Sequence, residues 1–135
     1  MYKEIIITII IIGIVLIGNA LTQNNTTKAV DVISSKLQNI QTEIIKTNKE
    51  GEEDKKKEKI EKSLKETETT WEEEYEKMAY YIEHTELEKV QTELSRLKAN
   101  IQTKQYETAI ENIAACSFIL KHIQDKSALK IVNIF

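Results

Sequence analysis

Residues 87–101 read LEKVQTELSRLKANI, and the spacing of the apolar side chains in this stretch decides the fold class. The apolar positions follow one another at intervals of three and four residues, which places them on one face of an α-helix. A single helix of this kind is not stable alone in water, because its apolar face must be buried against a partner. The stretch therefore predicts one member of a helical bundle.

Three other segments, 30–44, 60–82 and 106–123, carry the same spacing. The chain contains no proline and only three glycines, which leaves few turn-forming residues for a β-sheet. We therefore expect an all-α domain. Its three further apolar stripes are Val30, Ile33, Leu37, Ile40 and Ile44; Ile60, Leu64, Trp71, Tyr75, Met78 and Ile82; and Tyr106, Ile110, Ile113, Cys116, Leu120 and Ile123.

The order of these segments predicts two antiparallel helical hairpins, at about 26–84 and 85–124. Gly51 interrupts the first pair of stripes and is the natural place for the first turn. At the boundary between the hairpins, Thr85 and Glu88 have the spacing of a capping box, in which each side chain bonds to the other residue's backbone N–H. We expect the third helix to begin there.

The N-terminal segment differs from the bundle in composition. Residues 5–21 read IIITIIIIGIVLIGNAL, an apolar run broken only by Thr8 and Asn19. At about 1.5 Å of helix rise per residue the run reaches about 25 Å, slightly less than the hydrocarbon layer of about 30 Å. Its length and composition favour a helix that crosses a membrane once.

Two interpretations of this segment stay open. The triplet at 18–20 has the small-x-small form of a signal-peptide cleavage site. Against cleavage, the apolar run is longer than that of most signal peptides, and the acidic Glu4 stands beside Lys3 where a signal peptide is positively charged. We prefer a retained anchor over residues 1–21. The single basic residue Lys3 places the N-terminus inside the cell, with residues 22–135 forming a soluble, extracytoplasmic domain at the cell membrane.

The C-terminal tail, residues 128–135, reads ALKIVNIF. A tail this apolar is not expected to hang free in water. We expect it to fold back on the bundle or to dock on another molecule, with Phe135 as a candidate contact.

Few residues in the chain have the spacing of a catalytic or metal-binding motif. Charged residues make up 30% of the chain and the net charge is −3, so nucleic acid is not favoured as a partner. Cys116 has no second cysteine, and it fits a core position better than a nucleophile. His84 and His122 lack the spacing of a metal motif. We expect no catalytic residue, no cofactor and no metal; a metal held between the two histidines would revive an enzymatic function.

The aromatic end of the second helix carries Trp71 and Tyr75 four residues apart. Core packing explains such a pair better than a binding surface does. A pocket lined by Tyr75, His84 and Arg96 would instead indicate a bundle that binds a small molecule or an ion.

Arg96 is the only arginine, and lysine fills every other basic position. Its planar guanidinium indicates a specific carboxylate partner, although a chance surface arginine is equally compatible. Glu93 is close to it on the same helix. We expect pairing where the hairpins meet, and the candidates are Glu83 and Glu86, or Glu72 and Glu76 on the preceding helix.

Several motifs in the chain are similar to those of a known family. These are Trp71, the stretch IEHTELEKVQTELSRLK at 82–98, the stretch FILKHI at 118–123 and the terminal NIF at 133–135. Together they resemble DUF4363, a bacterial family of unknown function. Its pattern of an acidic residue and histidine, further acidic residues and an Arg-Leu-Lys step is matched by Glu83, His84, Glu86, Glu88, Arg96, Leu97 and Lys98, with Thr85 at one acidic position.

The resemblance covers the anchor and residues 71–135, whereas residues 26–70 match no motif of the family. It implies a small single-pass protein of spore-forming Gram-positive bacteria, without an assigned activity. Members are often encoded beside a multi-pass membrane protein, so the resemblance also implies a membrane partner.

The function that these observations favour is that of a membrane-anchored, non-enzymatic accessory protein, which binds or braces an integral membrane protein. An extracytoplasmic bundle that binds a small molecule or an ion is the alternative. A homo-oligomer is a further arrangement that exposed apolar segments allow.

Overall fold

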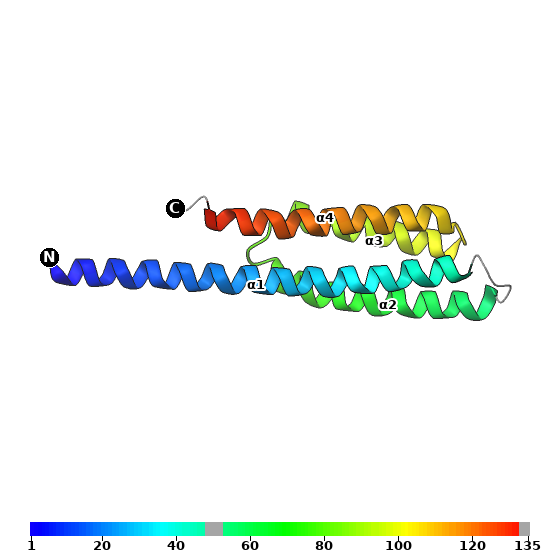
Figure 1. Cartoon of the computed structure of the whole chain (residues 1–135), viewed down its shortest axis with the longest axis horizontal. Coiled ribbons are helices and arrows are strands. Elements are labelled where there is room, and N and C mark those ends of the chain that lie inside the picture. The colour runs from blue at the N-terminus through cyan, green and yellow to red at the C-terminus, as the bar shows by residue number, and fades with distance from the viewer. Residues whose placement is uncertain (48–52, 133–135) are drawn as a thin grey trace.

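The computed structural model describes residues 1–47 and 53–132, and in this part of the chain every regular element is a helix. The helices are α1 (Tyr2–Thr47), α2 (Glu53–Met78), α3 (His84–Gln102) and α4 (Tyr106–Val132). All four lie along one long axis, with α1 and α3 running in one direction and α2 and α4 in the other (Figure 1). Helix α1 packs against α2 and α4, and α3 packs against α4 and, less closely, α2. The predicted all-α bundle of two hairpins is confirmed.

The four apolar stripes form the core of this bundle. Ile33, Leu37, Ile40 and Ile44 of α1 are fully buried. The stripe residues of α3 are also buried, with none above 1% exposed: Leu87, Val90, Leu94, Leu97 and Ile101. In α2 the stripe continues through Thr67, whose hydroxyl donates a hydrogen bond to the carbonyl oxygen of Ser63 at 2.8 Å. A stripe position can therefore hold a threonine, because the helix itself satisfies the hydroxyl. The stripe residues Tyr75, Ile82, Tyr106 and Ile110 lie at the edge of the core and are half-buried.

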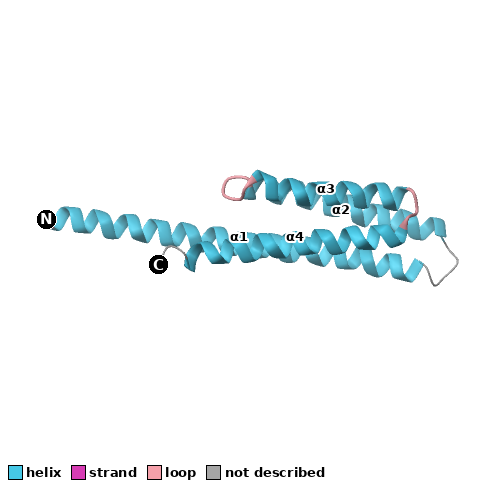
Figure 2. Ribbon diagram, turned by 90° about the horizontal axis from the view of Figure 1, so that it is seen from above, coloured by secondary structure: helices cyan, strands magenta, loops and turns pink. Residues whose placement is uncertain are grey.

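Helix α1 is longer than either of the two segments recognised in its sequence. It runs without a break through 46 residues, from the apolar run into the first stripe (Figure 2). The intervening residues 22–29 contain no proline or glycine. The hydroxyls of Thr22 and Thr26 bond to the carbonyls of Asn19 and Thr22, at 2.9 and 2.8 Å. Polar residues here continue the helix rather than end it.

The N-terminal part of α1 lies outside the bundle (Figure 1). Its isoleucine, valine and leucine side chains from Ile5 to Ile17 are between 38% and 65% exposed, and no described residue covers them. This segment is long and apolar enough to cross a membrane, and a signal sequence fits the same description.

The connections between helices differ partly from expectation. The turn predicted at Gly51 lies outside the described residues. Helix α3 begins at His84 with Glu83 as its N-cap residue, and no side chain caps it. The predicted capping box of Thr85 and Glu88 is therefore wrong, since Thr85 already lies inside the helix.

Between α3 and α4, Lys104 has a positive φ of 57°. Its N–H bonds to the carbonyl of Ile101 at 3.1 Å and the N–H of Gln105 bonds to that of Asn100 at 2.8 Å. These bonds satisfy carbonyl groups in the last turn of α3, in the way that is usual for helices that end at a glycine. In this chain Lys104, and not a glycine, adopts the left-handed conformation that ends the helix.

Helix α4 continues beyond the expected end of the second hairpin at residue 124 and stops at Val132. The first part of the predicted tail is therefore helical. Phe135 lies outside the described residues.

Candidate functional site

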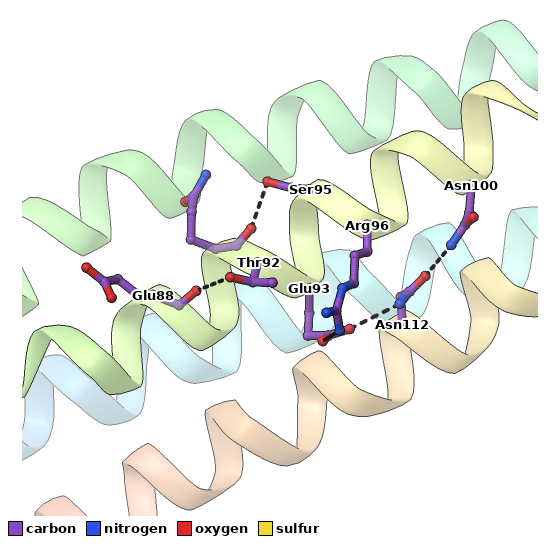
Figure 3. Close-up of polar contacts among 8 residues, drawn as sticks. Glu88, Thr92, Glu93, Ser95, Arg96, Asn100 and Asn112 are labelled. Atoms are coloured by element: carbon purple, nitrogen blue, oxygen red, sulfur yellow. Dashed lines mark hydrogen bonds and ion pairs between the residues drawn. The ribbon is translucent and has the colours of Figure 1, made fainter.

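A polar network joins α3 to α4 (Figure 3). Glu93 accepts a hydrogen bond from Arg96 Nη1 at 2.7 Å through one carboxylate oxygen and from Asn112 Nδ2 at 3.0 Å through the other. Asn112 Oδ1 accepts in turn from Asn100 Nδ2 at 2.7 Å. The Glu93 side chain is 13% exposed. The network therefore satisfies both oxygens of a largely buried carboxylate.

Arg96 makes its ion pair within its own helix, and its side chain is 63% exposed. Glu86 Oε1 pairs instead with Lys89 Nζ at 3.2 Å, and Glu83 Oε2 lies 3.4 Å from Lys126 Nζ. The expected pairing of Arg96 with Glu83 or Glu86 is wrong. Helix α3 extends from residue 84 as one helix, so the ten residues between Glu86 and Arg96 amount to about 15 Å of rise.

Cys116 lies one helical turn after Asn112 and is fully buried. Burial, with a smaller contribution from the negative charge of Glu93, raises the pKa of its thiol from the ordinary value of 9.0 to about 12. The thiol is therefore neutral near pH 7, and a thiolate nucleophile is not available at this position. Its expected place in the core is confirmed.

The aromatic end of α2 contacts α3. Trp71 is 1% exposed, and its Nε1 donates a hydrogen bond to Gln91 Oε1 at 2.7 Å. The Tyr75 ring meets the Trp71 ring edge to face at 5.9 Å between centroids, and the centroid of the His84 ring lies 6.5 Å from that of Tyr75. The pair thus packs in and beside the core, as expected, and links two helices that otherwise touch little.

Tyr75 also lines a shallow open groove between α2 and α3, of about 440 Å³, with Glu72, Glu76, Glu88 and Gln91. His84 and Arg96 do not line this groove, so Tyr75, His84 and Arg96 do not form one pocket. Among the described residues, no three His, Cys, Asp or Glu side chains are placed to hold a metal ion.

A protein-family model described as a domain of unknown function, DUF4363, matches residues 20–134. The chain belongs to the DUF4363 family. No curated protein and no solved structure matches it. The match begins at residue 20, near the end of the apolar run, and includes residues 26–70. The sequence motifs had placed the resemblance differently, since they left residues 26–70 unmatched and counted the apolar run as part of it.

The DUF4363 bundle has a second polar cluster at the end nearest the apolar run. A small cavity of about 20 Å³ lies between the α2–α3 connection and α4, lined by Ile82, Glu83, Glu86, Ile123, Lys126 and Ser127. The Ser127 hydroxyl is buried and has no hydrogen-bond partner among the described residues. The expected interaction residues Glu83 and Glu86 therefore gather at this end, apart from Arg96.

Sequence reasoning missed the residues that join the helices of the DUF4363 domain. Asn100 and Asn112 each precede a buried stripe residue, Ile101 and Ile113. An amide beside a stripe on each of two neighbouring helices is the signal that could have indicated an interhelical hydrogen bond.

Proposed function

We propose that this DUF4363 protein is a membrane-anchored, non-enzymatic accessory protein. In this proposal residues 5–21 cross the membrane, and the bundle binds or braces an integral membrane protein with several spans. The observation that carries the proposal is the continuity of α1 from the apolar run into the core of the bundle.

A continuous helix supports bracing better than tethering. A flexible linker lets a domain change its height and orientation above the membrane, whereas a helix transmits both from the span to the domain. Here the same helix contributes a complete core stripe, with four isoleucine or leucine side chains at 0% exposure: Ile33, Leu37, Ile40 and Ile44. Any tilt of the bundle relative to the span would have to bend α1 or disrupt this packing.

The proposed orientation places the N-terminus inside the cell and the bundle outside. Lys3 supports it, because basic residues close to a span favour the cytoplasmic side. Labelling intact cells with a membrane-impermeant amine reagent measures it, since the lysines of the bundle should react and those of an internal domain should not.

The test of the proposed function is photocrosslinking in native membranes. A photoreactive residue in place of Phe118, which is 76% exposed on α4, should capture a discrete integral membrane protein. A second probe carries the photoreactive residue at the exposed position Gln38 of α1. Absence of a membrane protein from the products at both positions would contradict the proposal.

A second pair of variants tests bracing itself. Residues 22–25 are replaced with Gly-Ser-Gly-Ser in one variant and with Ala-Glu-Ala-Lys in the other, so the length is unchanged and only the stiffness differs. We expect the helical replacement to retain crosslinking and the flexible one to lose most of it. Equal crosslinking by both would show that the bundle is merely tethered.

A further inference from the structure

We propose that the connection between α2 and α3, residues 79–83, rests on the lipid surface with Tyr80 inserted among the lipid headgroups. This rests on the proposed function, because it requires that residues 5–21 cross the membrane. The ligand is the bilayer interface itself, which lies next to the end of the span in that case.

The height of the connection follows from a contact with α1. The Tyr81 hydroxyl lies 3.3 Å from the Thr26 hydroxyl, which bonds to the carbonyl of Thr22 at 2.8 Å. Tyr81 therefore reaches the turn of α1 between Thr22 and Thr26, directly after the apolar run ends at Leu21. Five residues of helix rise are about 7.5 Å, and the headgroup layer on each side of a bilayer is about 5 to 8 Å thick. The connection is thus level with the outer part of that layer.

The chemistry of the connection fits this position. Tyr80 is 92% exposed, whereas its neighbours Tyr81 and Ile82 pack against the core. Tyrosine is enriched at membrane interfaces, where its ring meets apolar surroundings and its hydroxyl meets water. Tyr2, which is 84% exposed, lies about 28 Å of helix before Leu21, so an exposed tyrosine stands at the interfacial layer on each side of the membrane.

Helix α4 adds a second element at the same end. In both views its last turn reaches further toward the N-terminal end of α1 than the α2–α3 connection does (Figure 1, Figure 2). The final residues of this helix, 129–132, read LKIV. The helix backbone therefore carries an apolar sequence to the level at which α1 leaves the bundle.

The experiment measures the depth of a spin label in the full chain, reconstituted in phosphatidylcholine vesicles. The label is attached to Tyr80→Cys, and Phe118→Cys is the matched control. Lys126 lies 3.4 Å from Glu83, so the connection is level with residue 126, and Phe118 stands about 12 Å further from the membrane. A third label at Ile10→Cys reports on the span. Cys116 is buried, and labelling of the parent chain measures its background.

We expect the label at position 80 to collide several-fold less with a water-soluble nickel complex, and more with oxygen, than the label at position 118. It should lie shallower than the label at position 10. Circular dichroism of each variant checks the helical fold, which substitution of an exposed residue such as Tyr80 should leave unchanged.

Three results would overturn the proposal, and they differ in what else they imply. If position 80 is as accessible to nickel as position 118 while position 10 is in lipid, the anchor stands and the connection does not touch the bilayer. If position 10 is accessible to nickel, the span itself fails. Protection at position 80 that disappears when the protein is diluted into excess lipid would assign the surface to a second copy of the chain instead.

Discussion

Glu93 shows how unequally polar contacts contribute in this bundle. One of its partners, Arg96, is mostly exposed and lies on the same helix, whereas the other, Asn112, comes from the neighbouring helix and is half-buried. Exposed ion pairs contribute little, because water screens the charges and the long side chains lose freedom. Loss of a partner from a buried polar group costs more, because its desolvation is no longer compensated.

Replacement of the two partners should therefore have different effects. We expect Asn112→Ala to lower the free energy of unfolding by about 1 to 3 kcal/mol, since it leaves a Glu93 oxygen and the Asn100 amide unpaired. Arg96→Ala and Arg96→Lys should each change it by no more than about 0.5 kcal/mol. Denaturant unfolding of the full chain in detergent, followed by circular dichroism, measures this, with the exposed neighbour Glu111→Ala as control. An equal loss from Arg96→Ala and Asn112→Ala would disprove this division.

The buried thiol of Cys116 predicts a pH dependence. Its pKa is raised by burial and by Glu93, to about 12 in the folded chain. Between pH 9 and pH 12 the unfolded chain therefore loses this proton first, and stability falls as the pH rises. At pH 10 the thiol should lower the free energy of unfolding by about 1.4 kcal/mol relative to its value at pH 8. Comparison of the parent with Cys116→Ala at both pH values isolates the effect, and a parallel decline in both chains would show that the thiol makes no contribution.

Residue choice alone predicted the partner of Arg96 poorly. The single arginine indicated a carboxylate partner, but the residue type alone does not say where in the structure that carboxylate lies. Helical spacing does give a position, because residues three apart are neighbours on a helix, and it indicated Glu93. The Asn100 and Asn112 contact depends on how α3 and α4 are set against each other, which a single sequence does not state.

At the scale of whole helices, the apolar stripes predicted the fold well. Each stripe residue named from the sequence lies in the core or at its edge, because burial of one face is what makes such helices stable. Helix ends were predicted less well. The capping box was wrong, and the continuity of α1 was missed, because the polar stretch at residues 22–29 shows no stripe and yet contains nothing that stops a helix.

The C-terminal segment should contribute to stability or to partner binding. Residues 129–135 include five large apolar side chains, and each contributes about 1.5 to 3 kcal/mol when fully buried. We expect deletion of residues 129–135 to lower the melting temperature or reduce crosslinking to the proposed membrane partner. Deletion of 133–135 alone is the matched control, since it leaves the helical part intact. Melting and crosslinking that are unchanged by the longer deletion would show that the segment is dispensable.

At the scale of the whole molecule, the apolar segment and the bundle are joined by one helix but are structurally separable. The large apolar side chains from Ile5 to Ile17 are exposed, whereas Asn19, Thr22 and Gln23 are half-buried and Thr26 is fully buried. A chain beginning at Leu21 would therefore keep the core stripe of α1. Folding of the bundle consequently does not reveal whether the apolar segment is retained, and only the mature N-terminus does.

We expect the mature protein to retain residues 1–20 and to float with membranes in a density gradient, because the apolar run is long enough to act as a span. The alternative is cleavage after Ala20, at the small-x-small triplet of residues 18–20. Intact-mass measurement of the protein purified from its native membranes distinguishes the two. The matched variant carries Gly18→Leu and Ala20→Leu, which removes the triplet; a Cβ at Gly18 meets no atom within 4 Å, and Ala20 is exposed, so the fold should be unaffected. Retention of the N-terminal segment by both chains is the expected result. A parent chain that begins at Leu21, beside a variant that stays full length, would make the segment a signal sequence and leave the bundle without its anchor.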